Sequence, residues 1–320
     1  MILGYPAMLL NLLTIVILGV MTGAVVATPI AWWVSARLPA LCLRSRQSAL
    51  WLLAVFPLVS GLITALLSVL PELFPESDLW LGGIIHWHHV YLLSPTTWHG
   101  VFILASLAFL LGVAIISARK SITDYQRQCF LAQLSDKKEG VLAEVDAAVP
   151  MAFAVGLWRP QAFITSGLAS QITCEERQVI NLHEQAHVHR KDPLKKFLFQ
   201  VLTSLYPAKI RGVFQFELDL TLEQSADEAV LQRYSREAIA QSLLTVAKLT
   251  ACFERNNVYS QGQCHFAQQA VERRVHHLIG LSQYRSLPVL PTVFLVIISL
   301  LCSAASVDVL HHSFETLFLH

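Results

Sequence analysis

The run His183-Glu184-Gln185-Ala186-His187 combines residue types at a spacing that can perform hydrolytic metal chemistry. In a helix, residues four apart share a face, so both imidazole rings can reach one cation. The glutamate between them can act as a general base towards a water molecule. We therefore predict a metal centre with His183 and His187 as ligands and Glu184 as the catalytic residue. A surface helix with two solvated histidines is the alternative that this motif leaves open.

A second acidic motif supplies the ligand that such a site still needs. Glu223 and Asp227 lie four residues apart in another stretch with helical character. Zinc sites built on two helical histidines take a further protein ligand from elsewhere, and glutamate is a standard choice. Asp227, one turn later, can accept the N–H of a metal-bound histidine. Either acid alone could belong to an exposed surface, but together with the first motif they favour a Zn²⁺ site.

The helices that must position these residues carry their own end signals. Thr173 followed by Glu176 predicts a capping box at the start of the metal helix. Asp192 followed by Pro193 predicts the N-cap of the next helix, which should end before Pro207. That second helix has an apolar stripe, which fits either a protein core or a membrane surface.

Ahead of the metal helix, two short apolar runs at residues 152–155 and 162–165 are bounded by proline and glycine and predict a β-hairpin. Pro160 should confine the second strand to a sheet edge, where an extended peptide can add as a further strand. A purely structural hairpin is an equally open alternative. The predicted substrate-binding residues on this edge are Phe163, Ile164, Thr165 and Ser166.

The composition predicts a membrane protein. Hydrophobic residues make up 54% of the chain and charged residues 14%, and the mean hydropathy is +0.53. Four uncharged stretches have about the 17–25 residues that cross a bilayer, at roughly 8–34, 50–70, 101–117 and 286–306. We expect a mainly α-helical protein with four transmembrane helices. A zincin-like metallopeptidase domain, built from helices and the short hairpin, would lie between the third and fourth spans.

The resulting division assigns residues 1–118 to a membrane domain, 119–285 to the peptidase domain and 307–320 to a short tail. Basic residues set the orientation: Arg37, Arg44 and Arg46 lie between the first two spans, and all other lysines and arginines lie in 119–285. The positive-inside rule then predicts both termini outside and residues 119–285, with the metal motif, in the cytoplasm. The net charge of +1, without a basic cluster, argues against direct nucleic-acid binding.

Seven of the 13 histidines gather on the predicted outer side. One hypothesis is a metal- or pH-responsive input site. The alternative is an interfacial belt shared with neighbouring aromatic residues. The histidines are His86, His88, His89, His99, His311, His312 and His320.

The order of these motifs resembles the BlaR/MecR-type membrane zinc metallopeptidases. The matching segments are Gly156-Leu-Trp-Arg-Pro160, His183-Glu184-x-x-His187, Arg190-x-Asp192 and Glu223-x-x-Ala226-Asp227. The resemblance implies a gluzincin-like endopeptidase with Zn²⁺ on His183, His187 and Glu223 and with Glu184 as general base. We expect Asp192, like Asp227, to support a histidine ligand. In that family an outer signal activates cleavage, which leads to loss of a transcriptional repressor.

The function that we expect is therefore zinc-dependent cleavage of a peptide or protein, of a repressor or of the chain itself, at the cytoplasmic side of a lipid bilayer. The family's β-lactam receptors carry a penicillin-binding sensor domain after the last span, where this sequence has only residues 307–320. We therefore do not expect β-lactam sensing. Two alternatives remain open: a housekeeping membrane protease resembling HtpX, which three preceding spans disfavour, and a non-proteolytic transmembrane signal transducer.

Overall fold

The computed structural model describes residues 2–73, 91–93, 100–112, 115–116, 119, 122, 142–256, 264–280 and 284–318. Its principal helices are α1 (Tyr5–Ser35), α2 (Leu43–Leu73), α5 (Cys174–Arg190), α6 (Asp192–Leu202), α7 (Ala208–Val230), α8 (Arg236–Asn256), α9 (Cys264–Ile279) and α10 (Val289–Phe318). Short elements are η1 (Leu38–Ala40), α4 (Ser166–Ala169), η3 (Thr203–Leu205) and the strands β1 (Ile2–Leu3), β2 (Leu92–Leu93), β3 (Ala143–Val145), β4 (Ala152–Val155) and β5 (Gln161–Thr165).

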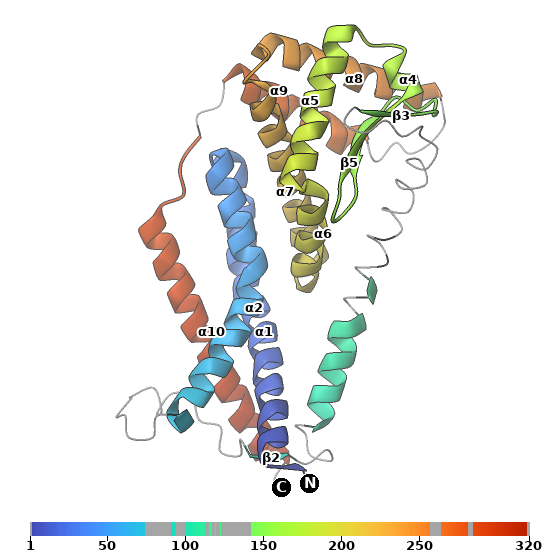
Figure 1. Cartoon of the computed structure of the whole chain (residues 1–320). Helices are drawn as coiled ribbons and strands as arrows, with labels where there is room; N and C mark the ends of the chain where they lie inside the picture. The colour runs from blue at the N-terminus through green and yellow to red at the C-terminus, as the bar shows by residue number, and fades with distance from the viewer. Residues whose placement is uncertain are drawn as a thin grey trace.

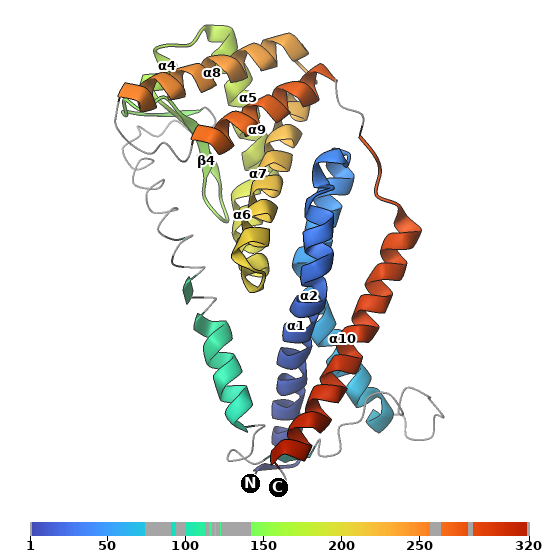
Figure 2. The same ribbon diagram turned by 180° about the vertical axis from the view of Figure 1, so that it is seen from behind.

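Within these described ranges, three helices are long and apolar enough to cross a membrane: Tyr5–Ser35, Leu43–Leu70 and Val289–Ser313. They run side by side, and both chain termini lie at the end away from α5 to α9 (Figures 1 and 2). The predicted third span appears only as a shorter apolar helix, Gly100–Gly112, so the four-span arrangement stays a prediction. α10 continues without a break to Phe318, past the predicted end of the fourth span at residue 306, and the division into domains stays a prediction.

The structure describes two of the seven histidines that were predicted on the outer side. His86, His88, His89, His99 and His320 lie outside the described residues. His311 and His312 belong to α10 rather than to a tail, and His311 is fully buried. The hypothesis of a histidine-rich input site therefore stays untested.

Glycines allow α1 and α2 to approach closely. A Cβ placed on Gly61 would lie 2.5 Å from the carbonyl oxygen of Val16, and one on Gly19 would lie 2.8 Å from the Cα of Gly61. Both distances are shorter than a carbon atom tolerates against backbone. Small residues at such a contact are the usual device for packing membrane helices at short range.

Replacing Gly61 with valine should therefore force α1 and α2 apart. We expect a loss of at least about 2 kcal/mol of unfolding free energy, since overpacking against backbone cannot be relieved by a rotamer change. Thermal unfolding of the purified protein in detergent measures this loss. Gly112→Val is the matched control, because a Cβ at Gly112 meets nothing within 4 Å. Equal midpoints for the two variants would contradict the close α1–α2 contact.

The small sheet has the strand order β3-β5-β4. β4 and β5 form the predicted antiparallel hairpin, with Phe153 opposite Phe163. β3 pairs with the other side of β5 in parallel. The prediction that the second strand lies at an edge is therefore wrong. Pro160 precedes β5 instead of interrupting it, so the N–H groups of β5 are free to pair on both sides. Among the described residues the two outer strands, β3 and β4, each have an open side.

Helices α6 and α7 pack directly on the candidate membrane helices α1 and α2. The turn between α6 and α7 lies beside α1 and α2 in both views (Figures 1 and 2). Tyr206 donates a hydrogen bond of 2.7 Å to the carbonyl of Leu53, and the rings of Phe199 and Trp51 meet edge-to-face at 5.4 Å. The apolar stripe of α6 is thus a core surface on the side that faces α2.

Candidate metal centre

Local sequence signals build α5, which carries the first motif. The Thr173 hydroxyl accepts the N–H of Glu176, and the Glu176 carboxylate accepts the N–H of Thr173, so the predicted capping box is present. The helix ends at Lys191, which adopts the left-handed conformation with φ 53°. Lys191, and not the predicted Asp192, is the N-cap of α6. Asp192 lies within the first turn, and its side chain turns back towards α5.

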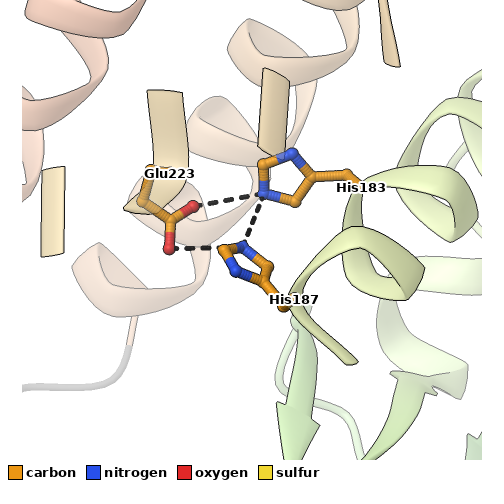
Figure 3. A group of neighbouring side chains, drawn as sticks. All are labelled: His183, His187 and Glu223. Carbon is orange, nitrogen blue, oxygen red and sulfur yellow. Dashed lines mark hydrogen bonds and ion pairs between the residues drawn. The ribbon is translucent and has the colours of Figure 1, made fainter. Parts of the chain in front are cut away.

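The three predicted ligands meet between α5 and α7 (Figure 3). His183 Nε2 lies 3.2 Å from His187 Nε2 and 3.2 Å from Glu223 Oε2. His187 Nε2 lies 3.5 Å from Glu223 Oε1. A tetrahedral zinc ion with bonds of about 2.0–2.1 Å holds its ligand atoms about 3.4 Å apart. The spacing therefore fits one small cation without rearrangement of the helices.

Two further carboxylates orient the imidazole rings. Asp227 Oδ1 lies 3.0 Å from His183 Nδ1, and Asp192 Oδ2 lies 2.8 Å from His187 Nδ1. With the proton on Nδ1, each ring donates to its carboxylate and directs the Nε2 lone pair towards Glu223. This is the arrangement by which proteins fix the tautomer of a metal-binding histidine.

Cations in turn hold these carboxylates. Arg274 from α9 donates to both oxygens of Asp227 at 2.7 and 2.9 Å and lies 3.2 Å from Glu223 Oε2. Arg190 and Lys195 bind Asp192 at 2.6 and 3.0 Å. Arg274 was not predictable from the sequence, because only the packing of α9 against α7 brings it to the site.

The electrostatics follow from burial and these contacts. Burial alone would lower the pKa of His183, but its hydrogen bonds to Asp227 and Glu223 outweigh burial and raise the pKa to about 9. The pKa of Glu223 lies well below its usual range, because hydrogen bonds from His183 and His187 overcome the opposing effect of burial. Burial raises the pKa of Glu184, which makes this carboxylate a better proton acceptor.

A cavity of about 930 Å³ opens onto the centre. Its wall includes Glu184, His187 and Glu223 together with the whole of β4 (Ala152–Val155). The predicted substrate residues are not part of this wall. Phe163, Ile164 and Thr165 are buried in the central strand, and Ser166 begins α4 and donates to Asp146 at 3.0 Å. The strand beside the centre is therefore β4.

A buried polar cluster connects the centre to α2. Arg46 was expected in a loop, but it lies in α2 with 1% of its surface exposed. It contacts Glu217 at 3.4 Å and donates to Gln224 at 3.0 Å, next to the ligand Glu223 on α7. Arg273 of α9 also binds Glu217, at 2.6 and 3.1 Å. α2, α7 and α9 are thereby joined directly behind the metal centre.

Replacing Arg46 with methionine should loosen this junction. We expect a loss of about 3 kcal/mol, at the lower end for breaking a buried ion pair, because Glu217 keeps its contact with Arg273. Chemical unfolding in detergent measures the loss. Arg44→Met on the same helix is the control, since Arg44 is exposed. A stability loss of equal size in both variants would contradict a specific role for Arg46.

Comparison with protein families gives a match. The model of a family described as BlaR1 peptidase M56 matches residues 88–278, more than half of the chain. Neither the comparison with curated proteins nor that with solved structures found a match. The matched range contains all three residues of the candidate centre, as well as Glu184 and both supporting aspartates.

Proposed function

Because the chain belongs to the BlaR1 peptidase M56 family, whose members are metallopeptidases, we propose that it is a zinc-dependent membrane endopeptidase. The observation that carries the proposal is the convergence of His183, His187 and Glu223 beside a cavity whose wall includes His187, Glu223 and Glu184. Their donor set of two imidazoles and one carboxylate is typical of a catalytic zinc site, which keeps one position open.

When bound, zinc would supply Lewis acidity towards the substrate carbonyl and towards water. Glu184 takes the proton from the attacking water and delivers it to the leaving amine. Asp227 and Asp192 hold the two histidine rings in place, and Arg274 fixes the carboxylates of Asp227 and Glu223. We assign the binding of the substrate backbone to β4, an outer strand of the sheet whose residues line the cavity.

The proposed topology puts the peptidase domain in the cytoplasm and both termini outside a bacterial inner membrane, with four spans. The location of the termini at the end opposite to α5–α9 supports it (Figure 1). Under this topology the substrate is a cytoplasmic polypeptide. The resemblance in motif order favours a transcriptional repressor or the chain itself, and hence a role in signal transduction.

Metal removal tests the proposal directly. The purified protein in detergent should contain about one zinc per chain and cleave an unstructured polypeptide such as casein. Dialysis against a chelator should abolish cleavage, and added Zn²⁺ should restore it. Mass spectrometry of the fragments identifies internal cleavage. A preparation without stoichiometric metal, or cleavage that survives chelation, would contradict the assignment.

A further inference from the structure

We propose that the α6–α7 hairpin is inserted in the leaflet nearer the peptidase domain, so that the catalytic cavity meets the bilayer surface. Its substrates would then include polypeptide segments that lie on the bilayer or emerge from it. The lipid contact stands independently, whereas the substrate class rests on the proposed function.

The α6–α7 hairpin reaches along α2 as far as the apolar part of that helix. Its partners there, Trp51 and Leu53, lie within the candidate span Leu43–Leu70. Arg46 is the last charged residue of α2 before the uncharged segment 47–71. Leu53 comes seven residues later, which corresponds to about 10 Å of helix. The hairpin therefore extends past the charged end of α2 and along its apolar part.

Exposed aromatic residues on α1 indicate the level of the interfaces independently. Tyr5 is 78% exposed at one end, and Trp32 and Trp33 are 61% and 55% exposed near the other. Tyrosine and tryptophan favour membrane interfaces, and the rise from Tyr5 to Trp33 is about 42 Å, the thickness of a bilayer with its headgroups. Ala27, about 9 Å below Trp33, belongs to the same buried core as Leu53 and Tyr206.

The outer surface of the hairpin has the composition of an interfacial element. Leu198 on α6 is 45% exposed and Val213 on α7 is 40% exposed. Lys209 is exposed at the turn, and Arg211 follows it half-buried. Long basic side chains can extend from an apolar surface to lipid phosphates. This combination suits phospholipid better than water.

The cavity extends along the same hairpin. Its wall follows α6 from Asp192 to Gln200 and α7 from Glu223 back to Gln215. Eight residues of helix are about 12 Å, so the far end of the cavity lies about two turns nearer the membrane than Glu223. Phe199, which lines the cavity, contacts Trp51 of α2. A chain that enters at this end does so at the level of the bilayer.

Depth measurements on the full chain test the insertion. Leu198→Cys and Val213→Cys, in a chain whose native cysteines are alanine, would carry an environment-sensitive fluorophore in phosphatidylethanolamine–phosphatidylglycerol vesicles. We expect blue-shifted emission that acyl-chain nitroxide lipids quench and aqueous iodide does not. Leu62→Cys, at an exposed position of α2, is the lipid control. Glu175→Cys, at an exposed position of α5, is the aqueous control. Labels that behave like Glu175→Cys would overturn the insertion.

Anchored substrates test the substrate class with the unmodified protein. One casein-derived segment would follow a transmembrane anchor directly, and a second would be separated from it by about 30 flexible residues, which can reach up to about 100 Å. We expect equal cleavage of both. Cleavage of only the spaced substrate would overturn the membrane-level cavity while keeping the peptidase assignment. Quenching by lipid without cleavage of either substrate would overturn the proposed function and keep the insertion.

Discussion

Replacing Glu184 with glutamine is expected to lower peptide cleavage by about 10²–10⁴-fold while zinc remains bound. Glu184 is 8% exposed, lines the cavity and lies outside the set of ligand atoms. Glutamine has the same shape, so α5 and the histidine rings should stay in place. It cannot accept a proton, however, and burial has already raised the pKa of Glu184 towards the range in which a base works efficiently.

The matched control for this variant is Glu175→Gln, an exposed glutamate in the first turn of the same helix. It removes the same charge without touching the cavity, and its cleavage rate should equal that of the unmodified protein. Metal content by mass spectrometry and initial rates on one peptide are measured for both. Full activity in Glu184→Gln would exclude Glu184 as the base. An unchanged cellular phenotype in an inactive variant would favour a non-proteolytic signal transducer.

Features set by neighbouring residues were predictable from the sequence. The capping box of Thr173 and Glu176, the shared face of His183 and His187, and the pairing of Glu223 with Asp227 all depend on helical spacing, and the structure reproduces each. The β4–β5 hairpin was also predictable, because proline and glycine residues bound its strands. These motifs assign the side chains of the candidate centre to the helices that carry them in the structure, before any tertiary contact is known.

Features set by distant segments were not predictable. β5 became central because β3, a three-residue strand without a distinctive pattern, pairs with its other side. Arg274 reaches the site only through the packing of α9 on α7. The sequence places Arg46 between the first two predicted spans, where an arginine is expected at the membrane surface. Its burial depends on Glu217 and Gln224, which lie far along the chain. Each of these needs contacts that no local pattern encodes.

Replacing Glu223 with alanine is expected to remove the metal itself. The two histidines would remain, but two imidazoles from one helix leave a zinc site one protein ligand short. Loss of a partner that only orients a ligand costs about 10–100-fold in affinity, so loss of the ligand should exceed 100-fold. Arg274 and Lys196, at 3.2 and 3.9 Å from the carboxylate, would also lose their shared counter-charge, which further disfavours a cation.

Asp219→Asn is the matched control, because it removes a nearby negative charge without removing a candidate ligand. Asp219 lies one turn earlier on α7, binds Lys196 at 3.2 Å and is 54% exposed, but it does not belong to the ligand group. Zinc retention during competition with a chromophoric chelator should be normal in Asp219→Asn and lost in Glu223→Ala. Because Glu184→Gln should lose activity with its metal in place, the two losses are distinguishable. If Glu223→Ala kept one zinc ion with unchanged affinity, the third ligand would have to be another residue, and α7 would serve only to orient His183 through Asp227.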